Sequence, residues 1–212
     1  MADKLTFYTN PMSRGRIIRW MLEEVGQPYE TVILGYGASM KSPEYLAINP
    51  MGKVPAIKHG DAVVTEGAAI CAYLADVFPE AKLGPANNAE RARYYRWMFF
   101  AAGPIEAAAN AKAMGWEAPA DKQGMLGFGS MAHVLDALEF ALKDTQYIAG
   151  DRFTAADVYF GSHIMWGTQF GTLEKRAAFE PYMARLHNRP AAVRAREIDD
   201  AIIAEQQKQQ QS

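Results

Sequence analysis

Short apolar runs, separated by residues that interrupt regular structure, fill the first 80 residues of the chain. Runs that alternate or are rich in β-branched residues are typical of strands, and they predict four: Leu5–Tyr8, Tyr29–Leu34, Val54–Lys58 and Ala62–Val64. Apolar residues at helical spacing predict three helices: about Arg14–Val25 with Ser13 as its candidate N-cap, Ser42–Ala47 and Glu66–Phe78. This order predicts a small α/β domain over residues 1–80, with a parallel pair of strands followed by an antiparallel pair.

Strand signals end at the breaker-rich stretch Pro79–Pro85, which we interpret as a linker. Five long helical patterns follow: Asn88–Met114, Asp121–Lys143, Thr154–Phe170, Glu174–Asn188 and Ala191–Gln207. Residues 86–212 are therefore expected to form an all-α domain. Thr154 and Asp157 match a capping box at the start of one of these helices. We interpret Asp157 as structural rather than catalytic.

Charge and composition exclude several classes of function. The 22 basic and 24 acidic residues nearly cancel, which gives no general reason to bind nucleic acid or an anionic membrane. The sequence shows neither a signal segment nor an apolar run of about 18 residues, so we expect a cytoplasmic protein. Cys71 is the single cysteine, which excludes an internal disulfide, a zinc–cysteine cluster and a dithiol redox pair. We expect no metal site.

Three short segments carry the candidate chemistry: Asn49–Pro55, Glu66–Ile70 and Phe153–Asp157. The first combines turn formers with a proline at the start of a strand, and the second opens a helix, where free N–H groups favour an anion. In this order and spacing, the three segments resemble the cytosolic glutathione S-transferase family of bacterial type, over essentially the whole chain. The resemblance implies a thioredoxin-like α/β domain followed by an all-α domain.

The resemblance also implies a site for glutathione, the co-substrate. The Val54–Pro55 bond is cis in the family, which turns the backbone N–H and C=O of Val54 toward the tripeptide, as an added strand would be paired. The γ-glutamyl group is expected at Glu66 and the backbone N–H of Gly67, where the family usually has serine. Lys41 and Lys53 are candidates for the glycyl carboxylate, although exposed lysines are common on any surface.

The group that stabilises the glutathione thiolate should lie in the first turn after the first strand. The thioredoxin-like half of this family descends from a strand followed by Cys-Pro-x-Cys, and this chain has Asn10, Pro11, Met12 and Ser13 there. Ser13 is the first candidate, by similarity to the serine classes, and Asn10 is nearly equal because it occupies the first cysteine position. Tyr8 is a third candidate, by similarity to the tyrosine classes, but it precedes the turn and can simply pack.

The resemblance implies transfer of glutathione to a small apolar electrophile. Candidate walls of an acceptor pocket between the two domains are Met12, Tyr36, Met114 and Trp116, because methionine and aromatic side chains suit variable apolar ligands. A homodimer is implied as well. Three alternatives stay open on the sequence alone: a glutathione-dependent disulfide-bond reductase, an isomerase or dehalogenase, and a non-enzymatic binding protein on the same fold.

Overall fold

The computed structural model describes residues 3–211 and groups them into two compact units. The first unit extends to Ala81 and resumes at Asn188, and the second runs from Lys82 to His187. Within the described residues, no helix has the length and apolar character needed to cross a membrane.

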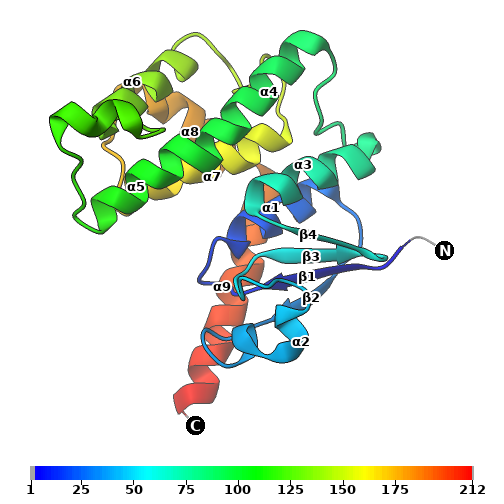
Figure 1. Ribbon diagram of the computed structural model, residues 1–212. Helices are drawn as coiled ribbons and strands as arrows, with labels where there is room; N and C mark the ends of the chain where they lie inside the picture. The colour runs from blue at the N-terminus through cyan, green and yellow to red at the C-terminus, as the bar shows by residue number, and fades with distance from the viewer. Residues whose placement is uncertain (1–2, 212) are drawn as a thin grey trace. The chain divides into compact units, whose positions relative to one another are not determined.

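A four-stranded sheet in the order β2-β1-β3-β4 forms the centre of the first unit (Figure 1). Its strands are β1 (Leu5–Thr9), β2 (Glu30–Ile33), β3 (Ala56–His59) and β4 (Ala62–Thr65). β1 pairs with β2 in parallel, whereas β1 with β3 and β3 with β4 are antiparallel. The predicted strands and their pairing directions are therefore confirmed, with bounds that differ by one or two residues.

Helices cover both faces of this sheet (Figure 1). Helices α1 (Gly15–Val25) and α3 (Gly67–Val77) pack against each other and against one face, where Phe7 and Ile57 are fully buried. The short helix α2 (Pro43–Leu46) covers the other face and buries Tyr45 beside Tyr8 and Ala56. The two faces follow from the alternation of side chains along each strand.

The last helix, α9 (Pro190–Gln211), packs along α1. It therefore groups with the sheet domain, whereas the sequence analysis assigned all of residues 86–212 to the helical domain. The helix buries Ala191, Ala192 and Ala195. Ion pairs that hydrophobic periodicity does not reveal also join α9, and the residue just before it, to α1: Glu24 with Arg189, Glu23 with Arg194, Arg19 with Asp199 and Arg16 with Asp200.

The second unit is helical. It contains α4 (Asn88–Phe100), α5 (Glu106–Ala113), α6 (Met131–Leu142), α7 (Ala155–Gln169) and α8 (Glu180–His187). The helix α7 lies at its centre, packed against α4 and α8, and most of its residues are buried. Thr154 donates its backbone N–H to Asp157 Oδ2 at 2.9 Å, and the predicted capping box is present. The predicted fold class, a thioredoxin-like α/β domain plus an all-α domain, is confirmed.

Two of the predicted helices are interrupted. The expected helix Asn88–Met114 contains a π-helical segment at Ala101–Ile105, where Pro104 lacks a backbone N–H to donate. The expected helix Asp121–Lys143 is wrong over its first part: a 3₁₀ turn ends at Met125 and α6 starts only at Met131. Glycines interrupt it, and Gly129 has a φ of 62°, which a helix cannot continue.

The predicted helix Glu174–Asn188 also begins later than expected. Its first part is irregular and is followed by a 3₁₀ turn at Ala177–Phe179, and α8 then starts at Glu180. At the start of α1 the N-cap position falls on Arg14, one residue after the predicted Ser13. Ser13 Oγ nevertheless accepts the N–H of Gly15 at 2.9 Å, so its hydroxyl still satisfies a first-turn amide.

Candidate functional site

Strand register brings three segments of the first unit to one end of the sheet. Ala56 pairs with Tyr8 on one side and with Thr65 on the other. Because both pairings are antiparallel, the residues after β1, those before β3 and those after β4 lie next to one another. We call this end of the sheet the candidate site and define it by the segments Asn10–Ser13, Lys53–Pro55 and Glu66–Gly67.

The turn after β1 is organised by Asn10. Its Nδ2 donates to the carbonyl of Leu34 at 2.8 Å, and its Oδ1 accepts the N–H of Met12 at 2.9 Å. The side chain is only 4% exposed. Sequence reasoning did not foresee this bracing role, because Leu34 lies 24 residues further along the chain. Asn10 therefore fixes the shape of the turn.

Ser13 is half-buried in the same turn. Its Oγ donates to the carbonyl of Asn10 at 2.7 Å and accepts the N–H of Gly15. A hydroxyl has one hydrogen and can rotate. Ser13 can donate to a bound anion only by releasing the Asn10 carbonyl, which still accepts the backbone N–H of Ser13 at 3.0 Å.

Tyr8, the third candidate for the thiolate, packs on the face covered by α2. Its ring centre lies 5.7 Å from that of Tyr45, and it contacts the cluster formed by Leu34, Met40, Tyr45 and Ala56. Its hydroxyl makes no hydrogen bond to a residue that the structure describes. The packing of the ring supports a structural role for this tyrosine.

The segment before β3 is held in place by two side-chain hydrogen bonds to one of its carbonyls. Asn49 Nδ2 donates to the carbonyl of Lys53 at 2.8 Å, and the Tyr45 hydroxyl donates to the same carbonyl at 2.6 Å. Burial raises the pKa of Tyr45 to about 12, so this hydroxyl stays a donor. Gly52 has a φ of 57°, and a Cβ there would lie 2.7 Å from the Met40 carbonyl, so only glycine fits.

Val54 follows this braced turn, and its bond to Pro55 is cis, as the resemblance implied. Among residues 3–211, neither the N–H nor the C=O of Val54 is hydrogen bonded to another backbone group. Val54 is half-buried. The edge that it presents can therefore pair with an extended peptide.

Glu66 occupies the N-cap position of α3 with a φ of 67° and a ψ of 119°. A residue with a side chain rarely adopts a positive φ, and such strain is concentrated at ligand sites. The Glu66 carboxylate is exposed and makes no capping bond. The first intrahelical bond runs from Ile70 N to Glu66 O, which leaves the amides of Gly67 and the next two residues at the open helix end. These amides attract an anion.

The two candidate lysines differ in their surroundings. Lys41 Nζ donates to the carbonyls of Met51 and Gly52, both at 3.0 Å, and so braces the turn before Val54. Lys53 is exposed, and its ammonium has no hydrogen-bond partner among the described residues. Lys53 is therefore the freer of the two to meet a carboxylate.

The predicted acceptor walls divide between the two units. Met12 and Tyr36 belong to the first unit and are exposed, and the Tyr36 hydroxyl donates to the Met12 carbonyl at 3.2 Å. Met114 and Trp116 belong to the second unit and are exposed as well. Their role in acceptor binding stays a prediction.

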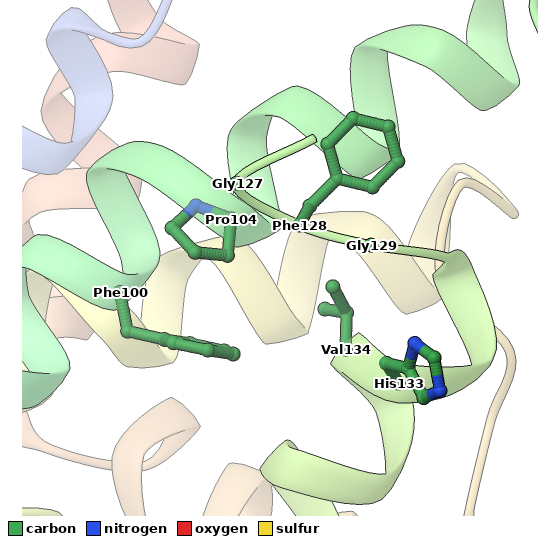
Figure 2. Close-up of a pocket in the computed structure, with 7 residues that line it drawn as sticks. All are labelled: Phe100, Pro104, Gly127, Phe128, Gly129, His133 and Val134. Atoms are coloured by element: carbon green, nitrogen blue, oxygen red, sulfur yellow. The ribbon is translucent and has the colours of Figure 1, made fainter. Parts of the chain in front are cut away.

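The second unit has a pocket of its own that the sequence analysis missed (Figure 2). It measures about 290 Å³ and is lined by Phe100, Pro104, Gly127, Phe128, Gly129, His133 and Val134. None of the four predicted acceptor walls lines it. The interruptions of the predicted helices create it, because the loop before α6 and the π-helical segment both contribute to its wall.

Polar groups of three kinds thus share the candidate site: the unpaired backbone of Val54, the open amides of α3 and the Glu66 carboxylate. The Val54 backbone can pair with peptide groups, the α3 amides with a carboxylate and the Glu66 carboxylate with an ammonium, so the set suits a short peptide with a free amino acid end. Within residues 3–211, no cluster of three or more His, Cys, Asp or Glu side chains could hold a metal ion.

Two domain families of known proteins match this chain. Residues 3–76 match the family described as glutathione S-transferase, N-terminal domain, and residues 113–190 match glutathione S-transferase, C-terminal domain. An Escherichia coli O157:H7 protein named glutathione S-transferase GstA is 32% identical over 168 residues, which span 76% of this chain and 78% of the relative. The chain is therefore a member of the glutathione S-transferase family of enzymes, as its resemblance implied.

Two further relatives cover more of the chain. Glutathione S-transferase GST-4.5 from Xanthomonas campestris pv. campestris is 26% identical and covers 86% of this chain and 92% of its own. Among solved structures, the theta class glutathione S-transferase from Xanthomonas axonopodis pv. citri with glutathione bound is 27% identical. It has a TM-score of 0.72 and covers 91% of this chain and 97% of its own. The shared fold extends over both units.

Proposed function

We propose that this chain is a glutathione transferase that binds glutathione at the candidate site and activates its thiol for attack on a small apolar electrophile. The attack forms a carbon–sulfur bond at the electrophile, and the thiol proton and the leaving group depart to solvent. The single observation that carries the proposal is the convergence of Val54, Glu66 and the α3 amides at one end of the sheet.

The glutathione contacts follow from the groups left unpaired there. The N–H and C=O of Val54, next to Pro55, pair with the cysteinyl unit as a neighbouring strand would. The carboxylate of Glu66 takes the γ-glutamyl ammonium, and the N–H of Gly67 takes its carboxylate. Lys53, rather than Lys41, takes the glycyl carboxylate, because Lys41 already donates to two carbonyls.

The thiolate lies against the turn after β1, at the start of α1. Ser13 is favoured as its donor, because its hydroxyl is half-buried and can rotate, whereas the Asn10 amide is buried and bonded to Leu34. A donor near a helix N-terminus stabilises the anion and lowers the thiol pKa. The thiolate fraction at neutral pH then rises, and so does the rate of attack.

Met12, Tyr36, Met114 and Trp116 are proposed to receive the electrophile. The protein is proposed to be cytoplasmic and to work as a homodimer, as relatives of this family would. The mass of the native particle, measured by light scattering, tests the dimer: a mass of one chain would overturn it.

Conjugation of glutathione to a chlorinated aromatic compound tests the function, with reduction of a small disulfide as the competing reaction. We expect conjugation to be the faster reaction for the wild-type protein. Glu66→Gln should weaken glutathione binding about 10-fold or more, because a charge-assisted contact is lost. Glu44→Gln is the matched control, because Glu44 is likewise an exposed glutamate near the start of a helix, α2, which covers the opposite face of the sheet from α3.

Faster turnover of the disulfide would favour the reductase alternative. Equal glutathione affinity in the Glu66→Gln and Glu44→Gln variants would overturn the assignment of Glu66. No detectable glutathione binding by the wild-type protein would favour a non-enzymatic role on the same fold.

A further inference from the structure

Two neighbouring carboxylates on α9, Asp199 and Asp200, hold two arginines that are three residues apart on α1. Arg19 Nε lies 3.2 Å from Asp199 Oδ1, and Arg16 Nη2 lies 2.6 Å from Asp200 Oδ1. The four residues belong to the first unit. Their spacing puts both arginines on the face of α1 that meets α9.

The buried Arg19–Asp199 pair, which we call the anchor, fixes α9 to α1. Arg19 is 2% exposed and Asp199 is 1% exposed. The Arg19 guanidinium also donates to Thr31 Oγ1 at 2.8 Å and lies 5.0 Å above the ring of Phe7. It thereby ties α1, the sheet and α9 together, and it fixes the position of α9 beside the start of α1.

Arg16 connects this anchored interface to the candidate site. Its Nη1 donates to the carbonyl of Pro11 at 3.4 Å, while Nη2 is held by Asp200. Pro11 lies between Asn10 and Ser13, in the turn proposed to hold the thiolate. The contact with Pro11 is long, so a flexible arginine would keep it only if the other side of the guanidinium were fixed.

We propose that Asp200 is a positioning residue for thiolate stabilisation: it fixes Arg16 against the Pro11 carbonyl and so holds the turn that carries Ser13. This inference rests on the proposed function. Asp200 touches no reacting atom and acts through Arg16. Being 64% exposed, it adds little to the stability of the fold, so its effect should appear in the chemistry of the turn.

The experiment uses Asp200→Asn in the full-length protein, with Arg194→Gln as the matched control. Arg194 forms another ion pair between α9 and α1, 3.3 Å from Glu23 Oε2 and likewise exposed, but near the opposite end of α1. Asp200→Asn should raise the apparent pKa of the bound thiol and lower kcat/KM at neutral pH about 3- to 10-fold, with KM for glutathione nearly unchanged. Arg194→Gln should change neither quantity.

Arg16→Gln should match Asp200→Asn in direction, and the double variant should be no worse than either single variant, because both break one connection. Asp200→Glu should restore part of the loss. Equal effects of Asp200→Asn and Arg194→Gln, or a lowered thiol pKa in Asp200→Asn, would overturn the proposal.

A second readout does not depend on glutathione. Amide hydrogen exchange at Met12 and Ser13 should be faster in Asp200→Asn than in the wild-type protein and in Arg194→Gln, because the turn loses its support. Unchanged exchange would contradict the inference even if the protein proves to be an active transferase. If the wild-type protein binds no glutathione, the proposed function fails and the positioning role of Asp200 toward the thiolate fails with it.

Discussion

Glu66 has a positive φ of 67° at the start of α3, where a glycine would be far less strained. The chain therefore has a residue with a side chain at a position where the backbone conformation favours glycine. A carboxylate beside open helix amides matches a ligand that carries both an ammonium and a carboxylate, so we propose that the strain serves binding rather than folding.

Replacing Glu66 with glycine separates the effect of backbone strain on stability from the effect of the carboxylate on glutathione binding. Glu66→Gly should leave the free energy of unfolding unchanged or raise it by about 1 kcal/mol, because the strain is relieved while the unfolded chain gains entropy. The same variant should lose glutathione affinity. Urea unfolding and calorimetric titration measure the two quantities, and a clearly less stable variant would contradict the strain argument.

Ser13 and Asn10 should respond differently to truncation. Ser13→Ala should raise the pKa of the bound thiol and cost about 0.5–1 kcal/mol of stability, because a half-buried hydroxyl and one capping contact are lost. Asn10→Ala should cost about 1–3 kcal/mol, because the buried Leu34 carbonyl loses its Asn10 donor. pH profiles of conjugation and urea unfolding check both. If neither variant moves the thiol pKa, another group stabilises the thiolate.

Asp157 gives a pH-dependent contribution to stability. Burial raises its pKa to about 6, against the hydrogen bonds donated by Thr154, Ile148 and Tyr182, which favour the ionised form. Between about pH 4 and pH 6 the folded chain holds a proton that the unfolded chain releases. The free energy of unfolding should therefore fall by about 3 kcal/mol as the pH rises through this window.

The comparison with Asp157→Asn isolates this contribution. The stability advantage of the wild-type protein over the variant should shrink as the pH rises from about 4 to 7, and then stay constant. Thermal or urea unfolding at several pH values measures it. An advantage that grows with pH would mean that the folded state prefers the ionised carboxylate.

At the level of single residues, the sequence was most informative where a motif is local. Asn49–Pro55 and Glu66–Gly67 could be interpreted because their turn formers and helix start are contiguous. The bracing of Asn10 by Leu34 and the link from Arg16 to Asp200 could not be foreseen, because each partner lies far along the chain. The hydrogen bonds of the Ser13 hydroxyl to the Asn10 carbonyl and the Gly15 N–H could not be foreseen either.

At the level of elements, α1 is the helix on which the site depends. Its N-terminus follows the turn of the candidate site, and its side chains form ion pairs with α9 from Arg16 near its start to Glu23 near its end. The predicted end of α1 is confirmed, because it lies just before Gly26, whose φ of 72° stops the helix. Where glycines are spread out, between Gly124 and Gly129, the helical pattern was extended too far.

Asp199→Asn should be strongly destabilising, because the buried Arg19 guanidinium loses its counter-charge. We expect a loss of about 3–5 kcal/mol in the free energy of unfolding, against less than about 1 kcal/mol for Arg194→Gln. Urea unfolding of both variants gives the comparison. The double variant Arg19→Met/Asp199→Leu should recover much of the loss, and similar losses for Asp199→Asn and Arg194→Gln would contradict the anchor role of the buried pair.

At the level of the whole molecule, the sequence predicted both domains and their fold class, because strand runs and helical periodicity change character near Pro79. It did not predict that α9 belongs with the sheet domain. Periodicity identifies a helix but does not say what the helix packs against, and the buried Arg19–Asp199 pair that joins α9 to α1 is visible only in the structure. The pocket beside His133 was not predicted either, because it forms where predicted helices are interrupted and helical periodicity does not show those interruptions.

We propose that this chain binds glutathione at the candidate site and keeps the bound thiol ionised. The pKa of the bound thiol, followed by the ultraviolet absorbance of the thiolate as the pH is varied, tests it most directly. We expect a pKa at least one unit below the value of about 8.5 for a free cysteine thiol. A bound thiol that titrates like free glutathione, or no glutathione binding at all, would contradict this proposal.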